Sequence, residues 1–117
     1  MTLEMLYQQI GGNYQDILQR LRKPERIEKF VLLFLKDDSF PSLERALEQG
    51  DVEAAFRAIH TLKGVCMNLS FDSLYQVSSQ MTECLRAGDL PGAMELLPLL
   101  TERYECHCRA IGSYAGI

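Results

Sequence analysis

A histidine, a lysine and a glycine lie close together within one predicted helix, in the segment His60-Thr61-Leu62-Lys63-Gly64. Around this segment, apolar residues recur at steps of three and four, the spacing of one helix face. At about 100° per residue, His60 falls roughly 140° from the centre of that face. We therefore expect a helix over residues 51–69 that points the His60 imidazole into solvent. The apolar positions are Val52, Ala55, Ile59, Leu62, Cys66 and Leu69.

These three residue types suit the chemistry of phosphorus. An exposed neutral imidazole is a good nucleophile toward a phosphoryl group near neutral pH. Lys63, three residues after His60, borders it on the same face and can stabilise the phosphate that His60 would carry. Gly64 costs about 1 kcal/mol relative to alanine in a helix interior, so some gain must offset it. The missing side chain would give a phosphoryl-carrying partner close access to His60.

The pentapeptide resembles the His-x-x-Lys-Gly signature of histidine-containing phosphotransfer (HPt) domains, and the resemblance is best over residues 43–89. The chain differs at two positions. Ser70 stands where many members have glycine, and Thr82 stands where many have a Gln or Glu that can orient the imidazole. The flanking features that match the family are Gly50-Asp51, Ala58, Asn68-Leu69 and Arg86-Ala87-Gly88-Asp89.

The resemblance implies a phosphocarrier in a two-component phosphorelay, without kinase activity of its own. His60 would accept a phosphoryl group from a receiver-domain aspartate, in the family usually on Nε2, and pass it to another aspartate. The partners would be receiver domains of response regulators or hybrid histidine kinases. No cofactor is expected on this chain, because the Mg²⁺ would belong to the receiver. Phe56, Arg57 and Met67 are the predicted docking residues.

Two other functions fit parts of the sequence. The same bundle could be a non-catalytic helical adaptor, with His60 serving only as part of a docking surface. A thiol- or metal-dependent sensor could use Cys106, His107 and Cys108. Adjacent helical residues point about 100° apart, however, so these three cannot face one ion from a regular helix. No second cysteine pair at ligand spacing completes such a site, which favours packing or surface roles.

Length and composition limit the classes of protein to which this chain can belong. The length of 117 residues predicts one helical domain over residues 1–117. A net charge of -4 argues against nucleic-acid binding. There is no apolar run long enough for a membrane span and no secretory signal. We therefore expect a cytoplasmic monomer whose four cysteines are reduced thiols.

The predicted helix boundaries rest on capping residues, glycine and proline. Thr2 and Asn13 can cap two short N-terminal helices, and Pro24 suits the first turn of a third. Asp72 is predicted to cap the helix after the motif helix. No segment alternates with period two over a useful length, so no strand is expected.

Short turns join the later helices and favour antiparallel packing. Gly50-Asp51 and Gly88-Asp89 each place a glycine past one helix and a capping aspartate before the next. Pro98 should kink or split the last helix, and residues 112–117 should fray. The predicted fold is all-α: an antiparallel four-helix bundle (up-down-up-down) with additional short N-terminal helices.

Overall fold

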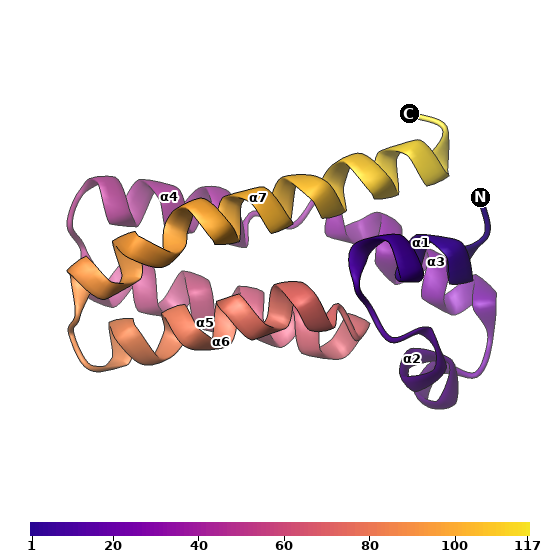
Figure 1. Ribbon diagram of the computed structural model, residues 1–117, viewed down its shortest axis with the longest axis horizontal. Coiled ribbons are helices and arrows are strands. Elements are labelled where there is room, and N and C mark those ends of the chain that lie inside the picture. Colours follow the sequence, from indigo (N-terminus) through magenta and orange to yellow (C-terminus); the bar gives the residue numbers. More distant parts are fainter.

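Seven helices and no strand make up the chain, which a computed structural model describes over residues 1–117 (Figure 1). The predicted all-α class is therefore confirmed. None of the seven combines the length and the apolarity that a membrane-spanning helix requires. The helices are α1 (Leu3–Ile10), α2 (Tyr14–Leu21), α3 (Pro24–Phe34), α4 (Ser39–Glu48), α5 (Val52–Leu69), α6 (Asp72–Arg86) and α7 (Leu90–Ala115).

Helices α4 to α7 run alternately up and down and form the four-helix bundle (Figure 1). The α4–α5 and α6–α7 turns each contain a glycine with positive φ, +66° at Gly50 and +75° at Gly88. Residues with a Cβ rarely adopt this conformation. The aspartates that follow cap the next helices as predicted: Asp51 accepts from the Ala54 amide at 3.1 Å, and Asp89 accepts from the Gly92 amide at 2.9 Å.

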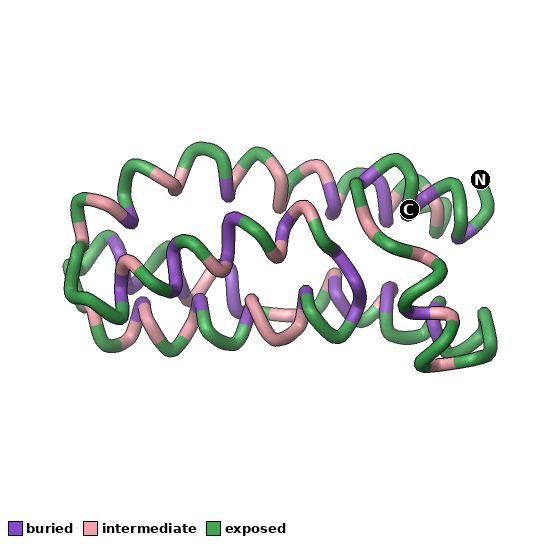
Figure 2. The backbone as a smooth tube through the Cα atoms, turned by 60° about the horizontal axis from the view of Figure 1, so that its bottom comes forward, coloured by how far each residue is buried: buried purple, intermediate pink, exposed green.

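One continuous apolar core of 26 buried residues draws members from all seven helices. The buried residues recur at intervals along the helices, as the colouring of the tube in Figure 2 shows. Phe40 of α4 and Tyr104 of α7 stack with ring centroids 4.1 Å apart and planes 12° apart. This stacking joins the first and last helices of the bundle. Burying one such large apolar side chain contributes roughly 1.5–3 kcal/mol.

Helices α1, α2 and α3 gather at one end of the bundle (Figure 1). Helix α1 packs on α7, α2 packs on α3, and α3 touches both α5 and α7. The Tyr7 hydroxyl of α1 donates a 2.7 Å hydrogen bond to the carbonyl of Leu69, the last residue of α5. The N-terminal segment therefore fixes the end of the helix that carries His60.

Pro98 does not split the last helix, which runs unbroken from Leu90 to Ala115. A proline inside a helix removes one backbone hydrogen bond and costs about 3 kcal/mol. Here Pro98 and Met94, whose carbonyl loses that bond, are both exposed residues. Packing of buried residues such as Leu100 against the core offsets the cost.

Two boundary predictions are wrong. The last residues do not fray: α7 continues to Ala115, because Ala110 and Ile111 are buried and the Tyr114 hydroxyl donates to Glu28 at 3.0 Å. Asp72 is the first residue of α6 rather than its cap. The N-cap position belongs to Phe71, whose ring is fully buried and draws the chain into the core one residue earlier.

Candidate functional site

His60 lies near the middle of α5 on its solvent face. Its predicted outward orientation is confirmed, since the residue is exposed while Ile59 and Leu62 beside it are fully buried. No side chain is hydrogen-bonded to the imidazole of this exposed residue. Because α5 is capped at both ends and packed along its length, the helix holds the ring on a rigid base.

Next to His60, on the side of α5 that faces α6, lie an aromatic ring and then a guanidinium group. The Phe56 ring, one turn before His60, lies with its centroid 5.7 Å from that of the imidazole. The Arg86 guanidinium carbon of α6 lies 5.0 Å from the Phe56 centroid. Arg86 also pairs with Glu83 at 3.4 Å, but both side chains are largely exposed and such pairs hold little energy.

A second cation–aromatic pair lies one turn beyond His60. The Lys63 Nζ is 6.0 Å from the centroid of the Tyr75 ring on α6. Lys63 is half-buried and forms no salt bridge with a carboxylate. Its charge is therefore opposed only by a neutral ring, an interaction worth roughly 0.5–1 kcal/mol when exposed. A dianionic phosphate on His60 would attract the ammonium more strongly than the ring does.

Gly64 has no packing reason to be a glycine. A Cβ built on it would meet no atom within 4 Å, and its φ is not in the left-handed region. Alanine would fit the space and favour the helix. The cost of Gly64 to the fold is not offset by anything within the chain.

The predicted docking residues surround His60 on α5. Arg57 and Met67 are exposed, with 57% of Met67 accessible, and Phe56 is half-buried. Met67 lies seven residues beyond His60, which places both on the same line along the helix. The structure thus presents the histidine with a cation, a guanidinium and two apolar side chains around it.

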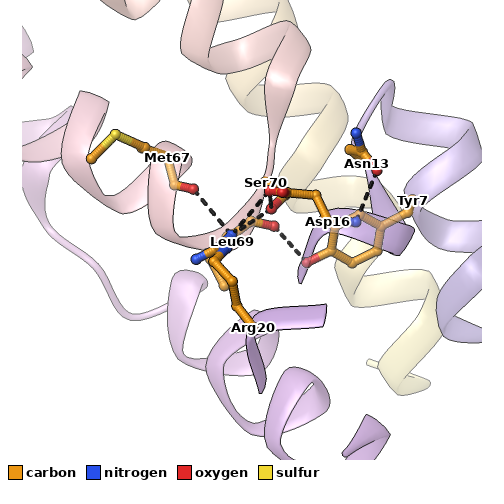
Figure 3. A network of polar contacts seen from close by, with 7 residues as sticks. All are labelled: Tyr7, Asn13, Asp16, Arg20, Met67, Leu69 and Ser70. Carbon is orange, nitrogen blue, oxygen red and sulfur yellow. Dashed lines mark hydrogen bonds and ion pairs between the residues drawn. The ribbon is translucent and has the colours of Figure 1, made fainter. Parts of the chain in front are cut away.

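The two departures from the family pattern have structural roles. Thr82 is fully buried, and its hydroxyl donates to the Ser78 carbonyl at 2.7 Å, so it does not orient the imidazole. Ser70 ends α5 in the left-handed conformation with φ +57°. Its hydroxyl donates to Asp16 at 2.7 Å and accepts from Arg20 at 2.5 Å, within the network drawn in Figure 3.

Cys106, His107 and Cys108 lie in different environments on α7. His107 is 1% exposed, and its Nδ1 is 2.7 Å from the Arg103 carbonyl oxygen. Burial lowers the pKa of His107 to about 4 and raises the pKa of the Cys108 thiol. No three His, Cys, Asp or Glu side chains converge on one point anywhere in the chain. These three side chains therefore do not share a common metal position.

A comparison with protein-family models matches residues 37–106 to the Hpt domain, which is more than half of the chain. The chain belongs to the Hpt domain family. No curated protein and no solved structure gave a significant match. The family assignment implies a phosphotransfer role in two-component signalling. The matched residues include α4, α5 and α6, whereas α1, α2 and α3 precede them.

Sequence reasoning found the α5 residues but missed their partners on α6. Tyr75 reads as an ordinary apolar position of its helix, and Arg86 reads as part of a turn. Both contacts depend on the register between two antiparallel helices, which periodicity within one helix does not give. The one usable signal is the α5–α6 turn, because it makes the two helices antiparallel neighbours.

Proposed function

We propose that this Hpt domain is a phosphocarrier in which His60 accepts a phosphoryl group from a receiver-domain aspartate and passes it to another. The observation that supports the proposal most is the combination of an exposed His60 with a helix-interior Gly64 that the fold does not need. A glycine retained at a cost to stability, one turn from a nucleophile, is explained by the close approach of a partner.

In the proposed step, the Nε2 lone pair of a neutral imidazole attacks the phosphorus in line with the bond to the aspartate. The N–P bond forms, the P–O bond breaks, and the aspartate leaves as a carboxylate. Nδ1 keeps its proton, so the ring carries a positive charge beside the phosphoryl dianion. The return step reverses these changes on a second aspartate. Such transfer depends chiefly on positioning and on neutralising charge.

The chain's own contribution is rigid placement and positive charge. Lys63 would leave the Tyr75 ring to pair with the phosphoryl oxygens, and Arg86 adds a second cation at the same face. The proposal assigns the Mg²⁺ and the acidic cluster to the receiver, and no kinase activity to this chain. It also places the protein in the cytoplasm as a monomer, with Phe56, Arg57 and Met67 contacting the receiver.

Phosphoryl transfer from a receiver domain is the direct test. Purified receivers labelled with radioactive acetyl phosphate would be mixed with the wild type and with His60→Gln. We expect label on the wild type that is acid-labile and alkali-stable, as phosphohistidine is, and none on the variant. Label that persists on His60→Gln would place the acceptor elsewhere.

The same experiment separates the carrier from a non-catalytic adaptor. An adaptor would bind receivers without becoming labelled, and His60→Gln would leave that binding unchanged. If no receiver in a broad panel labels the wild type while one of them binds it, the adaptor function replaces the carrier. Binding measured by calorimetry alongside the labelling distinguishes these results.

A further inference from the structure

Helix α3 has an exposed face that combines cations with large apolar side chains. At about 100° per residue, four of its residues lie within about 100° of the helix circumference: Arg26, Lys29, Phe30 and Leu33. We call these four residues the α3 ridge. All four are exposed, Phe30 by 44% and Leu33 by 47%. Among the exposed large apolar side chains of the chain, only these two lie one turn apart on the same helix.

Further cations lie at both ends of the α3 ridge. Arg22 and Lys23 precede the helix and Lys36 follows it, and all three are exposed. Six of the chain's 12 Lys and Arg residues fall within residues 20–36, which contain only two acidic residues. This segment is therefore positively charged in a chain whose net charge is -4. Such an uneven distribution of charge indicates an anionic partner.

The nearby acidic residues do not neutralise the ridge. The salt bridges of the chain involve none of the cations on the ridge or at its two ends. Glu25 and Glu28 lie outside the arc of the ridge, and Glu28 accepts from the Tyr114 hydroxyl at 3.0 Å. Asp37 is half-buried, and its carboxylate accepts from the Ser39 amide at 3.0 Å. The positive charge of the ridge therefore remains available to a partner.

The turn before α3 has a cation at a position that suits glycine. Arg22 has a φ of +68°, which residues with a Cβ rarely adopt. Its exposed side chain forms no salt bridge, so it gives the fold no ion pair in return for the strained backbone. What the side chain does supply is one more positive charge beside the α3 ridge.

We propose that the α3 ridge binds the surface of an anionic phospholipid bilayer. Phe30 and Leu33 would enter the layer between the lipid headgroups, while the cations around them pair with lipid phosphates. Amphipathic helices that lie in a membrane interface bind in this way. Each cation near an anionic bilayer strengthens binding about fivefold. Binding of this kind takes place at the surface and needs no membrane-spanning helix.

A lipid surface fits the ridge better than other anionic partners do. A nucleic acid would pair with the cations but would leave Phe30 and Leu33 in water. An acidic protein would need carboxylates placed around an apolar pocket shaped to these two side chains. A bilayer offers anionic headgroups and an apolar layer to any exposed helix face, so it satisfies both kinds of residue on the ridge.

Vesicle binding by the full chain tests the inference. Sedimentation compares vesicles of equal parts phosphatidylglycerol and phosphatidylcholine with vesicles of phosphatidylcholine alone. We expect the wild type to bind the anionic vesicles and not the neutral ones. Because the Debye length shrinks from about 10 Å at 0.1 M salt to about 3 Å at 1 M, the affinity should fall at least tenfold over this range. Absence of binding to the anionic vesicles at the lower salt concentration would overturn the inference.

A first pair of substitutions tests the charges of the ridge. Arg26→Gln combined with Lys29→Gln should weaken binding to the anionic vesicles about 25-fold, at about fivefold for each cation. The control combines Arg45→Gln with Arg109→Gln, which removes two exposed cations from α4 and α7 and changes the net charge equally. The control should bind within twofold of the wild type. Equal losses in the two double variants would mean that overall charge drives binding, and the inference would fail.

A second pair of substitutions tests the apolar side chains and keeps every charge. Phe30→Gln combined with Leu33→Gln should weaken vesicle binding about tenfold, because less apolar surface enters the bilayer. The control combines Met94→Gln with Leu99→Gln on α7, whose side chains are similarly exposed at 43% and 39%, and it should stay within twofold.

Soluble polyglutamate separates a lipid surface from an anionic partner of another kind. We expect it to bind the wild type more weakly than the anionic vesicles do. If polyglutamate binds as tightly, and the Phe30 and Leu33 double variant binds vesicles like the wild type, the ridge recognises negative charge alone and the inference fails. None of these measurements uses a receiver, so their outcome is independent of the proposed function.

Discussion

At the scale of single residues, the site is defined as much by Gly64 as by His60. Three neighbours of His60 on α5 have contacts that their side chains explain: Phe56 packs against the imidazole and Arg86, Lys63 lies by Tyr75, and Leu62 is buried in the core. Gly64 has none, since the space around its missing Cβ is empty. A residue that weakens its own helix without serving the fold points to a need outside the chain.

Gly64→Ala should therefore stabilise the protein while impairing transfer. The added methyl group favours the helix by about 0.5–1 kcal/mol. In the proposed function it also stands on the receiver's path to His60, and a misplacement of about 1 Å can cost about a hundredfold in rate, so we expect at least tenfold slower transfer. Urea unfolding and the initial rate of labelling from a phosphorylated receiver measure the two effects.

Gly112→Ala is the matched control for this substitution. Gly112 is also helical, and a Cβ there would also meet no atom within 4 Å, but it lies on α7. The control should gain stability and transfer at the wild-type rate. Equal transfer rates for the two alanine variants would show that Gly64 is not an access point.

At the scale of elements, contacts with the N-terminal helices α1 and α2 hold the C-terminal end of α5. Ser70 adopts the left-handed conformation that glycine favours, and L-residues pay roughly 1–2 kcal/mol for it. Its hydroxyl is held between Asp16 and Arg20, and the Tyr7 hydroxyl bonds the preceding carbonyl. These contacts offset the strained backbone and attach α2 to the helix that carries His60.

Two substitutions at Ser70 separate the effect of its left-handed backbone conformation on stability from the effect of its side-chain hydrogen bonds. Ser70→Ala and Ser70→Gly lose the same hydrogen bonds, but only glycine relieves the left-handed strain. We expect Ser70→Ala to lower the free energy of unfolding by about 1 kcal/mol or more, because Asp16 and Arg20 each lose a partner. Ser70→Gly should be about 1 kcal/mol more stable than Ser70→Ala. Urea denaturation of both variants measures the difference, and equal stabilities would mean that the backbone at residue 70 is unstrained.

The sequence predicts helix boundaries correctly where the residues at the boundary itself determine them. Adjacent residues determine the Gly50-Asp51 turn and the Asp89 cap. The spacing of apolar residues along α5 determines the outward orientation of His60. The error at Asp72 arose where tertiary packing overrides the local signal, and packing also keeps α7 unbroken at Pro98. The same limit applies to the site. The contacts of Tyr75 and Arg86 depend on how separate helices are placed against one another.

At the scale of the whole molecule, the core encloses an ionisable group. The His107 ring packs beside Phe71 and Phe34, with centroids 5.1 and 6.5 Å away. The Arg103 carbonyl can only accept, so Nδ1 carries the proton and Nε2 would take the next one. Nε2 is buried without a hydrogen-bond partner in the protein. Charging the ring would therefore place an unpaired cation among aromatic side chains, which is costly.

This burial makes the stability of the protein sensitive to mild acid. The pKa of His107 falls from 6.5 in the unfolded chain to about 4 in the folded one, mainly through desolvation. The unfolded state therefore binds a proton between these values and the folded state does not. The stability that His107 contributes is complete above pH 6.5 and is lost as the pH falls toward 4. A shift of this size corresponds to about 3 kcal/mol between pH 7 and pH 4.

His107→Leu removes the titrating group and leaves an apolar side chain of similar bulk in the core. Carboxylates also titrate in this range, but they do so in both proteins, so the difference between wild type and variant isolates His107. Urea unfolding at intervals from pH 7 to pH 4 should show the wild type losing about 3 kcal/mol more than His107→Leu. If the free energy of unfolding varied with pH in the same way in both proteins, the His107 ring would accept its proton without destabilising the folded state. The end of the bundle where α3 and α7 meet would then open more readily than its packing indicates.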